Sequence, residues 1–225
     1  MKGAQGFTLV ELLVTMAIVG ILLAVLLNLQ TSTVQFTEQQ SGIAQRLQAI
    51  NEVSGYVGDR VKAAQAVPDG LSLGGSICSR SGSAPCLAVI LPVVDSSCGA
   101  VVNWTLHTFR YIPRADLTAD EKAPMPGLDA VAHGLRETRL PSGVSSGTCA
   151  APMTTVPTSF SGTGLSGMIV DNLVLPASGT PAFEYDAATQ TVTLRFRSAV
   201  VRRGSIEYTP RTAPYVLRVF ARNVN

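Results

Sequence analysis

The N-terminal part of the chain is an almost unbroken apolar run. No residue between Leu12 and Leu27 carries a charge. At about 1.5 Å per residue, a helix from Phe7 to Leu27 covers roughly 30 Å, which is enough to cross the hydrocarbon core of a membrane. One acidic residue, Glu11, lies within this stretch, and a carboxylate at membrane depth is costly and usually functional. The pattern therefore predicts a transmembrane helix that carries one functional carboxylate.

Apolar residues at steps of three and four continue beyond this run. No proline occurs before Pro68, so the helix can extend well past the membrane. The spacing predicts that one face of the extension is buried against a globular domain. The members of this stripe are Ile43, Leu47, Ile50, Val53, Val57 and Val61.

The rest of the chain, residues 68–225, has the pattern of short strands within long loops. Its clearest strand alternates Val192, Leu194 and Phe196 with polar residues, as half-buried strands do. The pattern predicts an α+β fold, in which an antiparallel sheet packs on the stripe of the long N-terminal helix. The predicted strands are 86–91, 104–112, 168–175, 183–185, 191–200 and 215–219, with a turn at 186–190, an ambiguous segment at 127–140 and an exposed loop at 154–167.

The apolar run fits three common kinds of N-terminal segment poorly. In a secretory signal peptide, Glu11 would lie where positive charge is expected, and no small-x-small cleavage site follows Leu27. A lipoprotein signal is excluded because the first cysteine is Cys78. A plain membrane anchor accounts for the length of the run but leaves Glu11 without a role.

Charge and cysteine content indicate which side of the membrane the domain occupies. Lys2 precedes the span, and no Lys or Arg follows it until Arg46, which predicts a cytoplasmic N-terminus and an exported domain. An even number of cysteines on the exported side favours two disulfides, and their three possible connectivities stay open. The spacings match no zinc pattern. The four cysteines are Cys78, Cys86, Cys98 and Cys149.

The leader from Lys2 to Gly6, followed by Phe7-Thr8-Leu9-Val10-Glu11-Leu12-Leu13, resembles the N-terminus of type IV pilins and of the pseudopilins of type II secretion. The resemblance implies that a prepilin peptidase cuts between Gly6 and Phe7 and that the new amine of Phe7 is methylated. It also implies that Glu11 faces the Phe7 ammonium of a neighbouring subunit during assembly. The implied division is a leader at 1–6, a transmembrane and assembly helix at 7–28, a periplasmic half of the helix at 29–67 and a β-rich pilin domain at 68–225.

Two further features bear on the subtype. Asn28 stands where major pilins commonly carry a helix-kinking proline. The segments 170–173 and 183–186, followed by a Thr/Val/Leu/Arg strand, resemble the C-terminal part of PilW-type minor pilins and J-type pseudopilins. These features predict a minor pilin, with a J-type pseudopilin and a non-polymerising tethered binding protein as alternatives. The implied partners are prepilin peptidase, other pilins or pseudopilins, and an inner-membrane assembly platform.

One short segment resembles a catalytic motif. Residues 143–147 fit the Gly-x-Ser-x-Gly pattern of α/β-hydrolases, which requires a helix after the serine and a later histidine. Both histidines, His107 and His133, precede Ser145, and no helical pattern follows it. The histidines are also isolated from any cysteine pair. We therefore expect no catalytic residue, no metal site and no cofactor.

The C-terminal strands are rich in arginine. Residues 191–225 contain seven arginines and a single acid, Glu207. One interpretation is a phosphate-binding surface, because competence pili of the resembled family bind DNA. The other is ordinary arginine on the solvent face of an antiparallel sheet. The candidate residues are Arg195, Arg197, Arg202, Arg203 and Arg218.

Overall fold

The computed structural model describes residues 9–73, 75–202 and 204–222. Contacts between residues divide the chain into two units, 1–45 and 46–225. Helix α1 (Leu9–Ala63) begins in the first unit and ends in the second. The first unit therefore holds the apolar part of the helix, and the second is a β-rich domain that includes the last turns of α1.

Helix α1 ends four residues before the predicted end at residue 67. Beyond Ala63 the backbone pairs with a strand instead. The Gln65 N–H donates to the Ile90 carbonyl at 2.8 Å, and the Ile90 N–H donates to the Ala66 carbonyl at 2.9 Å. These bonds give Gln65 and Ala66 partners outside the helix, so the chain just after Ala63 runs beside Ile90 instead of continuing as helix.

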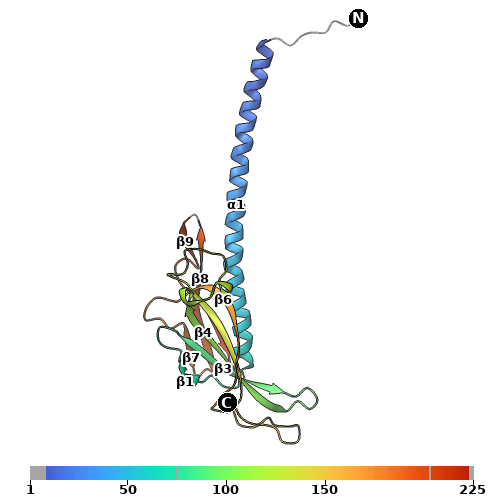
Figure 1. Cartoon of the computed structure of the whole chain (residues 1–225), viewed down its shortest axis with the longest axis vertical. Coiled ribbons are helices and arrows are strands. Elements are labelled where there is room, and N and C mark those ends of the chain that lie inside the picture. Colours follow the sequence, from blue (N-terminus) through green and yellow to red (C-terminus); the bar gives the residue numbers. More distant parts are fainter. Residues whose placement is uncertain (1–8, 74, 203, 223–225) are drawn as a thin grey trace. The chain divides into compact units, whose positions relative to one another are not determined.

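Within the described residues, ten strands follow the helix, and all their pairings are antiparallel (Figure 1). This arrangement confirms the predicted α+β class. Strands β1 (Leu71–Leu73) and β2 (Ser76–Cys78) form a small hairpin. The larger sheet has the order β10-β8-β6-β5-β4-β3, and β7 and β9 also pair with β8. Its strands are β3 (Cys86–Val94), β4 (Val101–Pro113), β5 (His133–Pro141), β6 (Leu165–Val174), β7 (Phe183–Asp186), β8 (Thr191–Arg202), β9 (Ser205–Thr209) and β10 (Tyr215–Phe220).

All six predicted strands are present, most of them longer than expected, and β5 lies in the ambiguous segment 127–140. Strands β1, β2 and β9 have no counterpart among the predicted strands. Each of these strands has three to five residues, which is too few to show an alternation of apolar and polar positions. Strand β9 forms because Gly204, with φ +75°, lets the chain turn back onto the end of β8.

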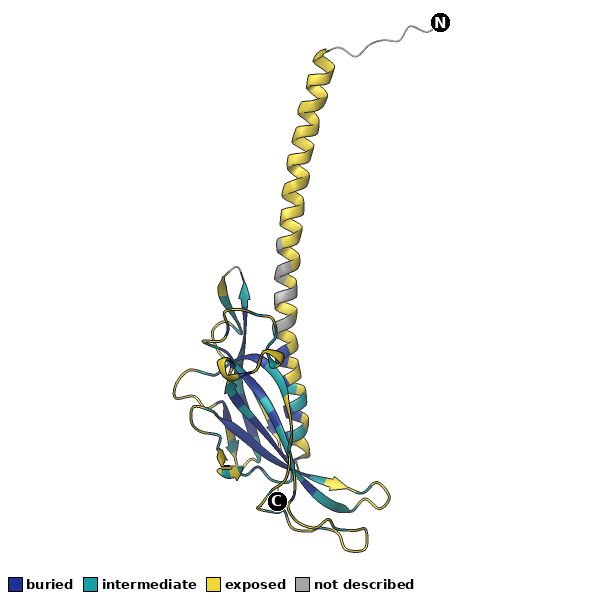
Figure 2. Cartoon of the chain, in the orientation of Figure 1, coloured by how far each residue is buried: buried dark blue, intermediate teal, exposed yellow. Residues whose placement is uncertain are grey.

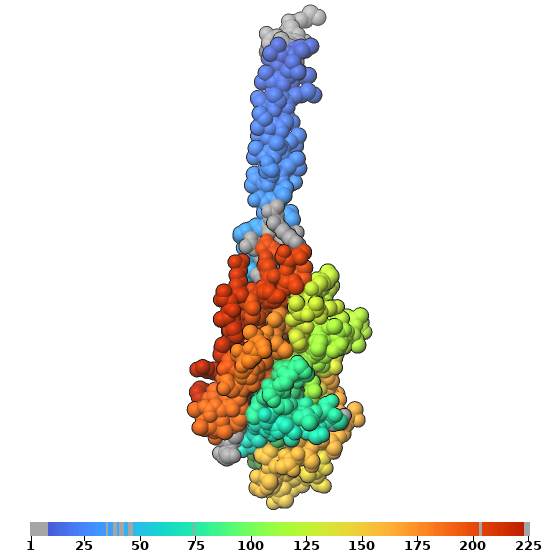
Figure 3. All heavy atoms as spheres, turned by 90° about the vertical axis from the view of Figure 1, so that its left-hand side faces the viewer, coloured from blue at the N-terminus to red at the C-terminus, as the bar shows by residue number. Residues whose placement is uncertain are grey.

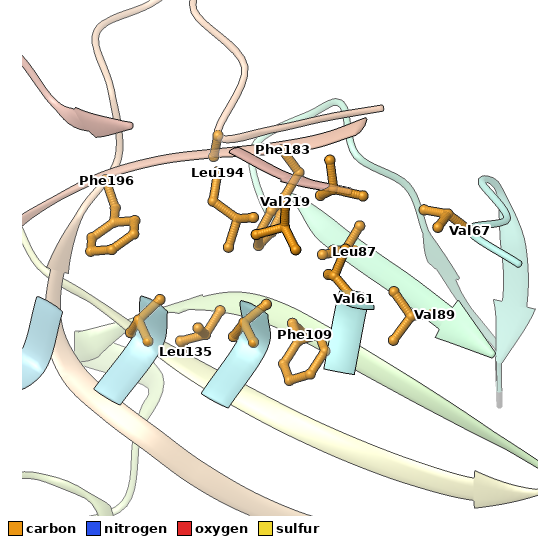
Figure 4. Packing of buried hydrophobic residues seen from close by; sticks show 14 of the residues in the cluster. Val61, Val67, Leu87, Val89, Phe109, Leu135, Phe183, Leu194, Phe196 and Val219 are labelled. Carbon is orange, nitrogen blue, oxygen red and sulfur yellow. The ribbon is translucent and has the colours of Figure 1, made fainter. Parts of the chain in front are cut away.

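The main core lies between the domain part of α1 and one face of the larger sheet. Ile50, Val53, Val57 and Val61 are buried, as the stripe predicted. They pack with side chains of β3, β4 and β5 and with side chains of β7, β8 and β10 (Figure 4). The sheet residues are Leu87, Val89, Phe109, Tyr111, Leu135, Phe183, Val192, Leu194, Phe196 and Val219.

The first two members of the stripe do not join this core. Ile43 is 42% exposed and Leu47 is 49% exposed. Among the helix residues whose burial is described, the first buried one is Ala49. The prediction was therefore wrong for these two residues, because the period of a helix indicates which face is apolar but not how far along that face the domain reaches.

Two disulfides reinforce the domain outside the main core. Cys78 is bonded to Cys86, and Cys98 is bonded to Cys149, which confirms the two predicted bridges and settles their connectivity. The first bridge lies in a small apolar cluster with Trp104. The second ties the β3–β4 turn to the loop of residues 142–164. Figure 3 shows the later part of this loop beside the β1–β2 hairpin.

Ile50 and Ile43 offer a matched test of where the helix enters the core. Ile50 is 6% exposed, so we expect Ile50→Ala to lower the free energy of unfolding of the domain by about 2–5 kcal/mol. Ile43→Ala should change it by no more than about 0.5 kcal/mol. The fluorescence of Trp104, the only tryptophan, gives the measurement during denaturant unfolding in detergent. Equal losses for the two variants would contradict the described boundary of the core.

Candidate functional site

The apolar part of α1 is the first candidate site. Residues Leu9–Val34 form a helix long and apolar enough to cross a membrane, and none of it is buried within the protein (Figure 2). Exposed apolar surface of this extent indicates contact with lipid or with other helices. The hydroxyls of Thr15 and Thr31 are satisfied within the helix, because each donates to a carbonyl one turn earlier.

Glu11 lies in the first turn of this helix. The backbone is helical around this acidic residue, and the Thr15 hydroxyl donates to the Glu11 backbone carbonyl at 2.9 Å. Gly6 and Phe7, the predicted processing site, lie outside the described residues. The structure therefore places Glu11, the predicted assembly residue, on the apolar helix. The prediction of the cleavage site rests on the sequence alone.

A polar cluster, which the sequence did not predict, ties α1 to the sheet. This Tyr56–Glu137 cluster consists of Tyr56 on α1, His107 on β4, and Glu137 and Arg139 on β5. The Tyr56 hydroxyl donates to Glu137 Oε2 at 2.7 Å, and His107 Nδ1 lies 2.7 Å from Glu137 Oε1. Arg139 Nε donates to Glu137 Oε2 at 2.8 Å, and another of its N–H groups donates to the Tyr56 hydroxyl. The pairing of β4 with β5 and the packing of α1 on the sheet together bring these residues into contact, so no local sequence signal could have revealed them.

The electrostatics of the Tyr56–Glu137 cluster favour a structural role. Burial by itself would raise the pKa of Glu137, but hydrogen bonds from His107, Tyr56 and Arg139 outweigh it and lower the pKa to about 2. A carboxylate with so low a pKa, both of whose oxygens already accept hydrogen bonds, is a poor general base. The cluster can hold the helix in one position against the sheet.

The candidate arginines of the C-terminal strands mostly have local partners. Arg195 pairs with Glu184 at 2.6 Å, and Arg202 lies 3.6 Å from Glu207. Arg197 donates to the Pro210 carbonyl at 2.9 Å and stacks on the Tyr208 ring at 4.4 Å. Arg218 is exposed on the outer face of β10, beside Thr193 of β8. Arg203 lies outside the described residues.

One group of potential metal ligands occurs in the described part of the chain. It contains Asp95, Cys98 and Cys149, whose ligand atoms lie within 4.8 Å of one another. The two cysteines are bonded to each other, so neither can supply a thiolate. His107 is engaged with Glu137, and burial lowers the pKa of His133. Structural bonds thus account for the cysteines and for His107.

Comparison with known proteins agrees with the N-terminal features. Residues 1–27 match the family described as the prokaryotic N-terminal methylation motif. With the apolar helix Leu9–Val34, which begins within the matched residues, this match makes the chain type IV pilin-like. Proteins that carry the motif are generally structural and non-enzymatic, and the motif implies processing by prepilin peptidase and assembly with other pilins. No curated protein and no solved structure matches the chain.

The Tyr56–Glu137 cluster makes a pH-dependent contribution to stability. The pKa of Glu137 is depressed from 4.5 to about 2, so its contribution is fully present above about pH 4.5 and is lost as the pH falls toward 2. It amounts to about 3 kcal/mol. Glu137→Gln should remove this part of the pH dependence, and Tyr56→Phe should remove a smaller share. Urea unfolding at several pH values, followed by Trp104 fluorescence, provides the test, and an unchanged pH profile in Glu137→Gln would contradict the assignment.

Proposed function

We propose that the protein is a minor type IV pilin, a non-enzymatic subunit that helps to prime or cap a pilus used for adhesion, twitching motility or DNA uptake. The observation that carries the proposal is the methylation motif at residues 1–27, continued by an apolar helix whose side chains are unburied within the protein. In this proposal, prepilin peptidase cuts between Gly6 and Phe7, and the new amine of Phe7 is methylated.

Glu11 is the proposed assembly residue. After cleavage it lies about one helical turn from the Phe7 amine. Within a bundle of such helices, the Glu11 carboxylate and the ammonium of a neighbouring Phe7 attract strongly, because the surroundings have a low dielectric constant. Each charge also relieves the desolvation penalty of the other. The pair therefore sets the axial register of an incoming subunit.

The orientation of the chain follows from the same proposal. The N-terminus is cytoplasmic, and the domain lies on the exported side of the inner membrane, as the bias in Lys and Arg suggests. Disulfides Cys78–Cys86 and Cys98–Cys149 support an oxidising compartment for the domain. The assembly platform of the inner membrane is the proposed partner of the helix before incorporation.

The minor-pilin subtype is supported by two features of the chain. Asn28 replaces the usual proline, and α1 continues without interruption from Leu9 to Ala63. The C-terminal strand series resembles that of PilW-type minor pilins. A J-type pseudopilin has the same features and is the second candidate. DNA contact through the C-terminal arginines has less support, because Arg195, Arg197 and Arg202 have partners within the domain.

Glu11→Ala separates processing from assembly. We expect the variant to be cleaved normally but to enter filaments at a small fraction of the wild-type level, because the Phe7 ammonium loses its partner. N-terminal sequencing reports cleavage, and immunoblotting of sheared filaments reports incorporation. Thr15→Ala, which leaves the charge in place, is the control. Wild-type incorporation of Glu11→Ala would refute the assembly role.

Deletion of the gene distinguishes the two candidate systems. A minor pilin predicts loss of surface pili and of twitching motility, with normal secretion of exoproteins. A J-type pseudopilin predicts the reverse. The measurements are a twitching assay and an activity assay for secreted enzymes on the same strain. Restoration by the wild-type gene controls for effects on neighbouring genes.

A further inference from the structure

The face of the larger sheet that points away from α1 carries a pocket of about 560 Å³. Phe109 of β4 and Leu135 of β5 pack in the core on the helix side, and side chains alternate between the two faces of a strand. Residues at the alternate positions of β4 and β5, among them Arg110 and Thr138, therefore form the floor of the pocket on the opposite face. The β1–β2 hairpin and residues 160–162 form its walls.

The walls of the pocket are held in place by packing and by covalent bonds. Leu73 of the hairpin and Phe160 of the loop both pack against the apolar cluster that contains the Cys78–Cys86 bridge. Phe160 also forms an isolated antiparallel bridge with Ser142 at the end of β5. A pocket whose walls are already ordered loses little conformational freedom when a ligand enters.

The charges that line the pocket are not balanced. Arg110 and Arg136 lie directly opposite each other in the pairing of β4 with β5, an arrangement that destabilises a sheet when both charges are unpaired. Glu121 compensates Arg136 with both of its oxygens, at 2.7 and 2.8 Å. Arg110 donates to the Ile77 carbonyl at 3.1 Å, and no acidic residue in the described part of the chain forms an ion pair with it.

No acidic side chain lines the pocket, so the guanidinium of Arg110 keeps an uncompensated positive charge there. Buried or half-buried guanidinium groups pair most strongly with carboxylate or phosphate groups. The pocket therefore favours a ligand that carries an anionic group.

The remaining surface of the pocket indicates what else the ligand contains. The hydroxyls of Thr138 and Ser166, on paired residues of β5 and β6, lie 3.4 Å apart, and a hydroxyl can both donate and accept hydrogen bonds. Phe160 and Leu73 add apolar surface. A sugar combines hydroxyls with apolar C–H faces, and the volume is in the range of small-molecule sites. A chain of phosphates would need several uncompensated cations, whereas Arg110 alone is uncompensated here.

We propose that this pocket binds a sugar that carries a carboxylate, such as a uronic acid. The carboxylate pairs with Arg110, the sugar hydroxyls bond to Thr138 and Ser166, and a C–H face of the ring lies against Phe160. The pocket lies wholly within the domain of residues 46–225, and neither processing nor assembly depends on it. The proposal therefore goes beyond the proposed function and can fail independently of it.

Glucuronate and glucose are matched probes, because they differ only in the carboxylate. Each is added to the full chain in a detergent without a sugar headgroup, and saturation-transfer NMR gives the dissociation constant. Arg110→Gln removes the charge and keeps a side-chain donor. Arg222→Gln makes the same exchange at an exposed arginine outside the pocket and is the control. Thr138→Val removes a hydroxyl of the floor and leaves Arg110 in place.

We expect glucuronate to bind the wild type and Arg222→Gln equally, and glucose to bind at least about tenfold more weakly. Arg110→Gln should weaken the binding of glucuronate about tenfold, and Thr138→Val should weaken it severalfold. The fluorescence of Trp104 during denaturant unfolding shows that each variant is folded.

Four results would overturn the proposal. They are no saturation transfer to glucuronate in the wild type, equal binding of glucuronate and glucose, undiminished binding in a folded Arg110→Gln or Thr138→Val, and displacement of glucuronate by an equal concentration of inorganic phosphate. The last result would show a site for simple anions that does not recognise the sugar.

Discussion

The burial of one face of α1 is the interaction on which the domain depends. Strands β6 and β8 pair at only two residues, so backbone hydrogen bonds alone join the two parts of the larger sheet weakly. The apolar side chains from Ile50 to Val61 contact both parts, with Phe109 and Leu135 on one side and Phe196 on the other (Figure 4). The helix thus replaces, through hydrophobic contact, some of the cohesion that a continuous ladder would have supplied.

Apolar contacts have little directionality, so they alone would let the helix slide along the sheet or rotate slightly about its axis. The Tyr56–Glu137 cluster adds directional contacts between the helix and the sheet. Its hydrogen bonds have fixed lengths and angles, and each member has a partner, so one axial position of the helix is favoured over its neighbours. In a filament subunit this matters, since any force on the apolar part of the helix reaches the domain through α1.

Much of this organisation could be predicted from the sequence, and the reasons for the misses are physical. The apolar run and the stripe have long, regular periods, so the helix and its buried face at Val53, Val57 and Val61 were predicted correctly. The limits of burial at Ile43 and Leu47 depend on the sheet, which periodicity within the helix cannot reveal. The Tyr56–Glu137 cluster and the disulfide connectivity depend on strand register. Register describes how two strands align with each other, and the pattern within one strand does not show which residue of another strand lies opposite.

The same packing bears on the open edge of β6. Strand β8 meets β6 only at Leu173 and Val174, near the C-terminal end of β6. A soluble domain normally blunts such an edge with lysine, proline or a covering loop. Here the last turns of α1 lie nearby, with Asp59 paired to Lys62 and Arg60 stacked on the Tyr56 ring. The packing of α1 against both parts of the larger sheet thus compensates for a strand pairing that is incomplete along β6.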